Sequence, residues 1–132
     1  MIKKINIQNM KSAKNIAMDC SGLNILIGTN LSGKSSILQG LLFVGQNFGN
    51  AVGLNGRFLS MGTLEENRCV YSNEKNIRAG VEDSKGHAVE MTLFKEGDVL
   101  KLRRDIGLPK QQNLCQKILT LDREKIYLIS LI

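Results

Sequence analysis

A glycine-rich octapeptide constrains the fold of this 132-residue chain more than any other feature of its sequence. It reads Gly28-Thr29-Asn30-Leu31-Ser32-Gly33-Lys34-Ser35 and fits the pattern G-x-x-x-x-G-K-[ST]. A short apolar run, Leu23-Asn24-Ile25-Leu26-Ile27, precedes it and is typical of a strand buried on both faces of a sheet. Apolar residues at helical spacing follow it, so we expect an amphipathic helix from about 34 to 47. The order strand, glycine-rich turn, helix predicts an α/β fold with the strand ending at Ile27 at its centre.

The chemistry of this turn is that of a phosphate loop, or Walker A motif. Its glycines let the backbone curl, so that successive N–H groups from about Asn30 to Ser36 point into one concavity at the positive end of the helix. We expect Lys34 to place a positive charge on the β- and γ-phosphates of ATP and the Ser35 hydroxyl to coordinate Mg²⁺. Ser36 caps the helix, cradles the α-phosphate, or does both. The other residues of the loop are expected to act mainly through their backbone, and they are Gly28, Thr29, Asn30, Leu31, Ser32 and Gly33.

The rest of the chain alternates between strand and turn patterns. Ile5 and Ile7, and then residues 16–20, have the period of half-buried strands. Further along, alternating apolar residues predict an antiparallel β-meander that forms a layer of its own, with strands at 77–81, 89–93 and 100–102.

The last part of the chain carries two weaker patterns, a short helix at 114–119 and a buried strand at 126–132. The sequence thus predicts one domain over residues 1–132, a P-loop NTPase-like lobe with a mixed sheet, one main helix after the phosphate loop and the β-meander.

Composition narrows the function classes only a little. No apolar run approaches the roughly 18 residues of a membrane span, and no secretory signal opens the chain, so we expect a cytoplasmic protein without a membrane partner. Cys20, Cys69 and Cys115 are too far apart for a local metal knuckle and are expected to be reduced thiols, and His87 is expected to be structural. The net charge of +6 permits a nucleic-acid partner, but its dispersed lysines and arginines fit a solvated surface better.

A family resemblance appears across the first third of the chain. Three stretches, Ile5-Asn6-Ile7-Gln8-Asn9-Met10-Lys11-Ser12, Leu23-Asn24-Ile25-Leu26-Ile27-Gly28 and Ser35-Ser36-Ile37-Leu38-Gln39, resemble the start of SMC/RecF-like AAA ATPases with an ABC-type head. The resemblance implies an N-terminal lobe of such a head. It also implies that Asn9, Lys11 and Ser12 lie near the nucleotide, with Lys11 as a second phosphate contact.

The resemblance also implies parts that we do not find in this sequence. Hydrolysis in this family needs a magnesium-binding acid after a buried strand, an adjacent glutamate and a signature loop from a partner head. Two short segments resemble such parts. Asp122 follows an apolar run, as the magnesium-binding acid does, and Leu59-Ser60-Met61-Gly62 resembles the signature loop. Both fit surface turns better. The catalytic residues are therefore unknown.

Three function classes remain open at this point. The first is an incomplete ATPase lobe that hydrolyses ATP only with elements supplied elsewhere, by a protein partner or a second copy. The second is an ATP-dependent regulatory module without turnover. The third is a DNA-binding protein that uses its basic surface.

Overall fold

The computed structural model describes residues 1–29 and 32–107. Asn30, Leu31 and residues 108–132 lie outside the described residues. Residues 108–132 include several predicted features, namely the helix at 114–119, the strand at 126–132, Cys115 and Asp122.

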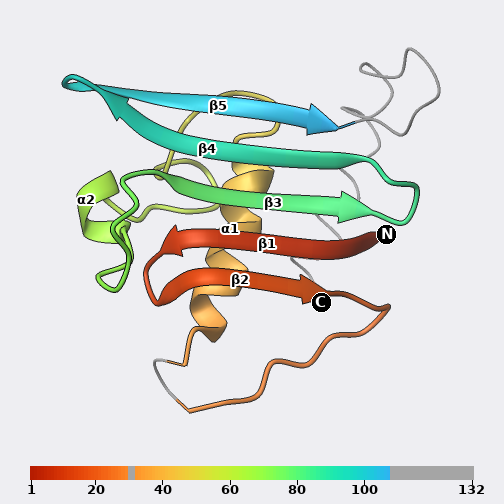
Figure 1. Ribbon diagram of the computed structural model, residues 1–132. Coiled ribbons are helices and arrows are strands. Elements are labelled where there is room, and N and C mark those ends of the chain that lie inside the picture. The colour runs from red at the N-terminus through yellow and green to blue at the C-terminus, as the bar shows by residue number, and fades with distance from the viewer. Residues whose placement is uncertain (30–31, 108–132) are drawn as a thin grey trace.

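Five strands and two helices make up the described chain (Figure 1). In order along the chain they are β1 (Ile2–Met10), β2 (Ala13–Asp19), α1 (Lys34–Gln46), α2 (Leu64–Asn67), β3 (Ile77–Asp83), β4 (Ala88–Glu96) and β5 (Val99–Gly107). The helix predicted after the phosphate loop is confirmed as α1, which begins at Lys34. None of the described helices is long and apolar enough to cross a membrane.

The strands form a single sheet in the order β2-β1-β3-β4-β5, and each described pairing is antiparallel. Ile7 shows how the sheet is joined, because it pairs with Ile16 of β2 on one side and with Ala79 of β3 on the other. The β-meander predicted from alternation is confirmed, and its strands are longer than the patterns indicated. The expectation that it forms a separate layer is wrong, because the ladder between β1 and β3 makes it continuous with the N-terminal hairpin.

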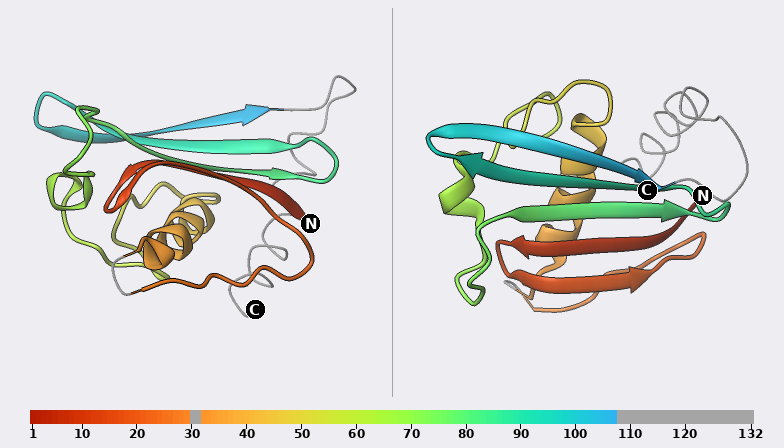
Figure 2. Two further views of the ribbon diagram at one scale, coloured as in Figure 1. Left: turned by 60° about the horizontal axis from the view of Figure 1, so that its bottom comes forward. Right: turned by 45° about the horizontal axis from the view of Figure 1, so that its top comes forward.

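Helix α1 crosses one face of this sheet and covers its central strands (Figure 2). Phe43 and Val44 of the helix are buried, as are Ile7 of β1 and Met91 of β4 on the covered face. Gly40 lets the helix lie close to β1, because a Cβ at this position would fall 2.8 Å from Cγ1 of Ile7. The core is thus one layer of helix on one sheet.

The C-terminal end of α1 is fixed by a fully buried asparagine. Asn47 Oδ1 accepts from the backbone N–H groups of Val52 and Gly53 at 2.9 and 2.7 Å. Its Nδ2 donates to the carbonyl of Phe43 at 2.8 Å, and Arg104 of β5 donates to the carbonyl of Asn47 itself at 2.9 Å. A cation at this end also complements the helix dipole. These bonds hold the helix axis in place, so that its other end keeps a fixed position under the hairpin of β1 and β2.

The prediction of a central buried strand at 23–27 is wrong in the structure. The segment joins no strand of the described sheet, and Leu23, Ile25 and Ile27 are 65%, 73% and 89% exposed. It follows a local turn in which Asn24 Oδ1 accepts from the backbone N–H of Ser21 at 2.9 Å, and it runs past α1 without pairing (Figure 2). A strand buried on both faces needs hydrogen-bonded neighbours and cover, and the described residues give this segment neither. For the same reason, the mixed sheet that this strand would have created is not observed in residues 1–29 and 32–107.

Candidate functional site

The tip of the hairpin between β1 and β2 has an unusual backbone. Asn9 and Lys11 have φ values of 58° and 51°, a left-handed conformation that non-glycine residues seldom adopt. The backbone N–H of Lys11 donates to the carbonyl of Asn67 at the end of α2, at 2.7 Å. Such a conformation persists only where surrounding contacts enforce it.

The side chain of Asn9 supplies several of those contacts. It is 1% exposed, its Oδ1 accepts from the backbone N–H of Cys69 at 3.0 Å, and its Nδ2 donates to the carbonyls of Glu74 and Asn76 at 2.7 and 2.9 Å. Asn9 therefore ties the hairpin tip to the segment that leads into β3. The structure gives the Asn9 side chain a role in holding the hairpin, and its predicted place near the nucleotide stays a prediction.

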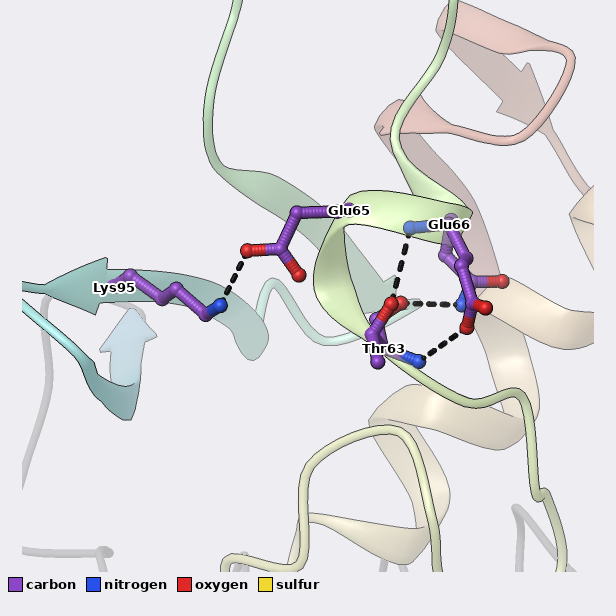
Figure 3. Close-up of polar contacts among 5 residues, drawn as sticks. Thr63, Glu65, Glu66 and Lys95 are labelled. Atoms are coloured by element: carbon purple, nitrogen blue, oxygen red, sulfur yellow. Dashed lines mark hydrogen bonds and ion pairs between the residues drawn. The ribbon is translucent and has the colours of Figure 1, made fainter.

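The short helix α2 contacts the same tip through Asn67, and its own polar contacts are drawn in Figure 3. Thr63 and Glu66 form a capping box, in which Thr63 Oγ1 accepts from the Glu66 N–H at 3.3 Å and Glu66 Oε2 accepts from the Thr63 N–H at 2.9 Å. These hydrogen bonds lower the pKa of the Glu66 carboxyl. Glu65 forms an ion pair with Lys95 of β4 and so links the helix to the sheet. Because Asn67 ends this helix, its carbonyl is held where the N–H of Lys11 can reach it.

Opposite the hairpin tip, α1 begins with backbone donors that no side chain of the described residues caps. Its N-cap, Gly33, has a φ of 98°, makes no side-chain cap hydrogen bond and is followed by a first turn without acidic residues. The N-terminal N–H groups of a helix carry partial positive charge, so this end is suited to an anion. A left-handed N-cap of this kind favours glycine, which the G-x-x-x-x-G-K-[ST] pattern supplies.

A direct hydrogen bond joins the hairpin to the helix. Ser12 Oγ lies 2.9 Å from Ser36 Oγ. A Cβ added at Gly33 would lie 3.4 Å from the same Ser12 oxygen, so Ser12 lies close to the N-cap. Ser12 therefore lies over the first turn of α1. Its predicted place near the nucleotide stays a prediction.

Between these elements lies a pocket of about 510 Å³. Among the described residues, no acidic side chain lines it, and two of its lining side chains are cationic. The lining residues are Lys11, Ser12, Ser32, Gly33, Lys34, Ser35, Ser36 and Gln39. Of the residues predicted to contact the nucleotide, the structure brings together Lys11 and the run from Ser32 to Ser36. Gly28 and Thr29 lie beside this pocket rather than in its lining, and Asn30 and Leu31 are outside the described residues.

Lys34 is held by its own loop in this structure. Its Nζ donates to the carbonyls of Gly28 and Thr29, the second at 2.7 Å, and lies 3.4 Å from Ser32 Oγ. The ammonium group thus lies against Gly28 and Thr29 and lines a pocket whose described residues are all neutral or cationic. This donor set fits a polyanion such as a triphosphate.

The same residues fit a magnesium ion only in part. Ser35 is exposed and offers one hydroxyl oxygen, the type of ligand that Mg²⁺ accepts. Within the described ranges, no group of three or more His, Cys, Asp or Glu side chains is placed to hold a metal. Ser35 would be one ligand, with phosphate oxygens and water as the others.

The signature-like segment is a structural loop. Asn55 Oδ1 accepts from the backbone N–H groups of Met61 and Gly62, at 3.1 and 2.9 Å, and Asn55 Nδ2 donates to the carbonyl of Gly62 at 2.9 Å. The interpretation of this segment as a turn therefore holds.

His87 also has a structural environment. Its Nδ1 lies 2.8 Å from Asp83 Oδ2 across the turn between β3 and β4. The residue immediately precedes β4, which begins at Ala88.

One pocket residue was missed by reasoning from sequence. Gln39 follows Ser36 by three positions, so the two share a helix face. That spacing is the signal that would have placed it beside the loop residues, but a polar residue on a helix is more often simply solvated.

The fold and the pocket together define an α/β lobe with a site suited to an anion at a helix N-terminus. Residues 1–128 match the family model of the AAA ATPase domain. The chain is also 28% identical over 114 residues to the DNA double-strand break repair Rad50 ATPase of Sulfolobus acidocaldarius, in a match that covers 79% of this chain and 12% of that protein. The chain therefore belongs to the AAA ATPase domain family, and its predicted relation to the SMC/RecF-like ATPases is confirmed.

Proposed function

We propose that this chain binds ATP with Mg²⁺ in the pocket between the hairpin tip and the N-terminus of α1. The observation that carries the proposal is the convergence of Lys11 and Lys34, from elements 23 positions apart in the sequence, on one acid-free pocket beside an uncapped helix end. Family membership supports the choice of ATP among phosphate-bearing ligands.

Each pocket residue has a defined role in this proposal. Lys34 binds the β- and γ-phosphates, and the backbone N–H groups of the loop and first turn bind phosphate oxygens. Ser36, held by Ser12, lies beside the α-phosphate. Lys11 makes a second phosphate contact from the hairpin side. Ser35 binds Mg²⁺, which when present neutralises phosphate charge.

Hydrolysis is proposed to need groups beyond the pocket described here. No carboxylate that could activate water lines it among the described residues. The chain spans 12% of the length of the Rad50 relative, so most of that protein has no counterpart in the match. We propose that a protein partner or a second copy completes the catalytic site.

A nucleic-acid surface is less well supported by the geometry. The uncovered face of the sheet carries both signs of charge, as cross-strand pairing places Lys4 beside Glu82 and Glu90 beside Asp105. Arg103 also donates to Asp105, at 2.9 Å. The name of the relative raises DNA as a ligand, but a face of mixed charge that includes paired acidic residues does not favour a phosphate backbone.

Titration of a fluorescent ATP analogue into the purified chain, with Mg²⁺ and with EDTA, tests the proposal. Lys34→Ala is expected to weaken binding by about 2–3 kcal/mol in both conditions, because a charge-assisted contact to phosphate is lost. Ser35→Ala should weaken it mainly when Mg²⁺ is present.

Lys3→Ala is the matched control, since it removes the same charge from the far end of β1, outside the pocket lining. Equal affinity of Lys34→Ala and Lys3→Ala would show that the pocket is not the nucleotide site.

A further inference from the structure

Gln39 is the one lining residue to which the proposed function gives no role, and its side chain is incompletely paired. Its Oε1 atom is buried and has no hydrogen-bond partner among the described residues. A buried amide oxygen without a donor is unfavourable, so most such atoms in proteins are satisfied. Beside a ligand pocket, such an atom can be satisfied by a donor that arrives with the ligand.

Position along α1 indicates which part of a nucleotide Gln39 would meet. A helix rises about 1.5 Å per residue, so the Gln39 backbone lies roughly 4.5 Å beyond Ser36 and roughly 7.5 Å beyond Lys34 along the axis. In the proposed binding mode, the β- and γ-phosphates lie at Lys34 and the α-phosphate lies at Ser36. The next group of the nucleotide along this line is the ribose.

Hydrogen-bond chemistry agrees with this order. Phosphate oxygens at neutral pH only accept hydrogen bonds, so they cannot satisfy the Gln39 carbonyl oxygen. Ribose hydroxyls can donate. The terminal torsion of a glutamine side chain is broad and can rotate, so Oε1 can be presented to the pocket without displacing the rest of the side chain. The opposite wall, made by Lys11 and Ser12, keeps the ligand against this face of α1.

We propose that Gln39 accepts a hydrogen bond from a ribose hydroxyl of the bound nucleotide and thereby makes the pocket selective for ribonucleotides over deoxyribonucleotides. This inference rests on the proposed function, because it assumes that the triphosphate lies at Lys34 and Ser36. It adds a specificity-determining residue that the G-x-x-x-x-G-K-[ST] pattern does not include.

Competition titrations with four nucleotides test it. The purified chain is loaded with a fluorescent ATP analogue, which is then displaced by ATP, 2′-deoxy-ATP, 3′-deoxy-ATP or purine riboside triphosphate, which lacks the 6-amino group. The wild type should bind ATP about threefold to tenfold more tightly than one of the two deoxy analogues, the range expected for one neutral hydrogen bond. Gln39→Met, which keeps the length of the side chain, should reduce that ratio to about one.

Gln46→Met is the matched control. Gln46 lies on the same helix and also has an unpaired buried oxygen, but it bonds the carbonyl of Gly53 at the far end of α1 and does not line the pocket. It should leave the ribose preference unchanged. The melting temperature of the unliganded Gln39→Met variant should not fall, because no hydrogen bond of the described protein is removed; a purely structural glutamine would lower it.

The outcomes separate this proposal from the one on which it depends. If Lys34→Ala loses affinity and Gln39→Met keeps the wild-type ribose preference, the phosphate site stands and the role of Gln39 is overturned. Another outcome concerns the base. Suppose that Gln39→Met abolishes the preference for ATP over purine riboside triphosphate but keeps the preference for ATP over both deoxy analogues. Gln39 then contacts the base, and the ribose assignment is wrong. If the wild type binds none of the nucleotides, both proposals fail.

Discussion

Ser12 Oγ and Ser36 Oγ lie 2.9 Å apart and join the tip of the β1–β2 hairpin to the first turn of α1. Ser36 is buried, and its hydroxyl is the link between the two walls of the pocket. The hydrogen bond therefore serves both the stability of the lobe and the geometry of the candidate site.

Ser12→Ala is expected to lower the free energy of unfolding by about 0.5–1.5 kcal/mol, because one partly buried hydrogen bond is lost. It should also weaken ATP binding, since the hairpin that carries Lys11 is no longer fixed to the helix. Urea unfolding and nucleotide titration measure the two effects. Ser35→Ala, at an exposed position in the same turn, should leave stability unchanged. A Ser12→Ala protein as stable as the wild type would contradict this account.

Substitution of Asn9 separates its hydrogen bonds from its backbone conformation. Asn9→Gly keeps the positive φ without strain but leaves the N–H of Cys69 and the carbonyls of Glu74 and Asn76 unpaired. We expect a loss of about 2–4 kcal/mol in the free energy of unfolding. Asn9→Ala should lose about 1 kcal/mol more, because a left-handed alanine is strained. Equal stabilities of the two variants by urea unfolding would show that the φ of 58° contributes nothing.

Gly40 and Ile7 should behave as a coupled pair. Gly40→Ala places a Cβ 2.8 Å from Ile7 Cγ1, and Ile7 is fully buried, so overpacking should outweigh the gain in helix propensity. The expected net loss is about 1–2 kcal/mol. Ile7→Val shortens the conflicting side chain, so the double variant should lose less than the sum of the two single losses. Additive losses in a double-mutant cycle measured by urea unfolding would show that the two residues do not press on each other.

Asp83 should make stability depend on pH at the acid end. Burial acts to raise the pKa of its carboxyl, but hydrogen bonds from the His87 ring and from the N–H groups of His87 and Lys85 outweigh this and lower it. Since the folded pKa lies below the ordinary value of about 3.9, the stabilisation is complete above that value and is lost as pH falls through the folded pKa.

Asp83→Asn should therefore be less stable than the wild type by about 1–3 kcal/mol at pH 7, with the difference shrinking below about pH 4. Urea unfolding at pH 7, 5 and 3 measures it. Asp98→Asn, in the exposed turn between β4 and β5, should show no such dependence. A difference that stays constant down to pH 3 would exclude Asp83 as the titrating group.

The local elements of this protein were determined by its sequence. Helical spacing after the glycine-rich loop predicted α1, and alternation predicted the strands of the hairpin and the β-meander. Such patterns report which side of an element is buried, and they need no knowledge of the partner. The phosphate-loop pattern likewise predicted where a helix N-terminus occurs, because a helix start depends on a few adjacent residues.

What the tertiary structure decided is which elements meet. The apolar run at 23–27 has the composition of a central strand, yet Ile27 is exposed, because a strand exists only where another strand pairs with it. The β-meander and the hairpin share one sheet because β1 pairs with β3. This ladder links residues 70 or more positions apart in the sequence. Asn9 and Gln39 show the same limit at the site. Whether a polar side chain fixes a hairpin, lines a pocket or faces water depends on groups distant in sequence, and only the packed fold places those groups around it.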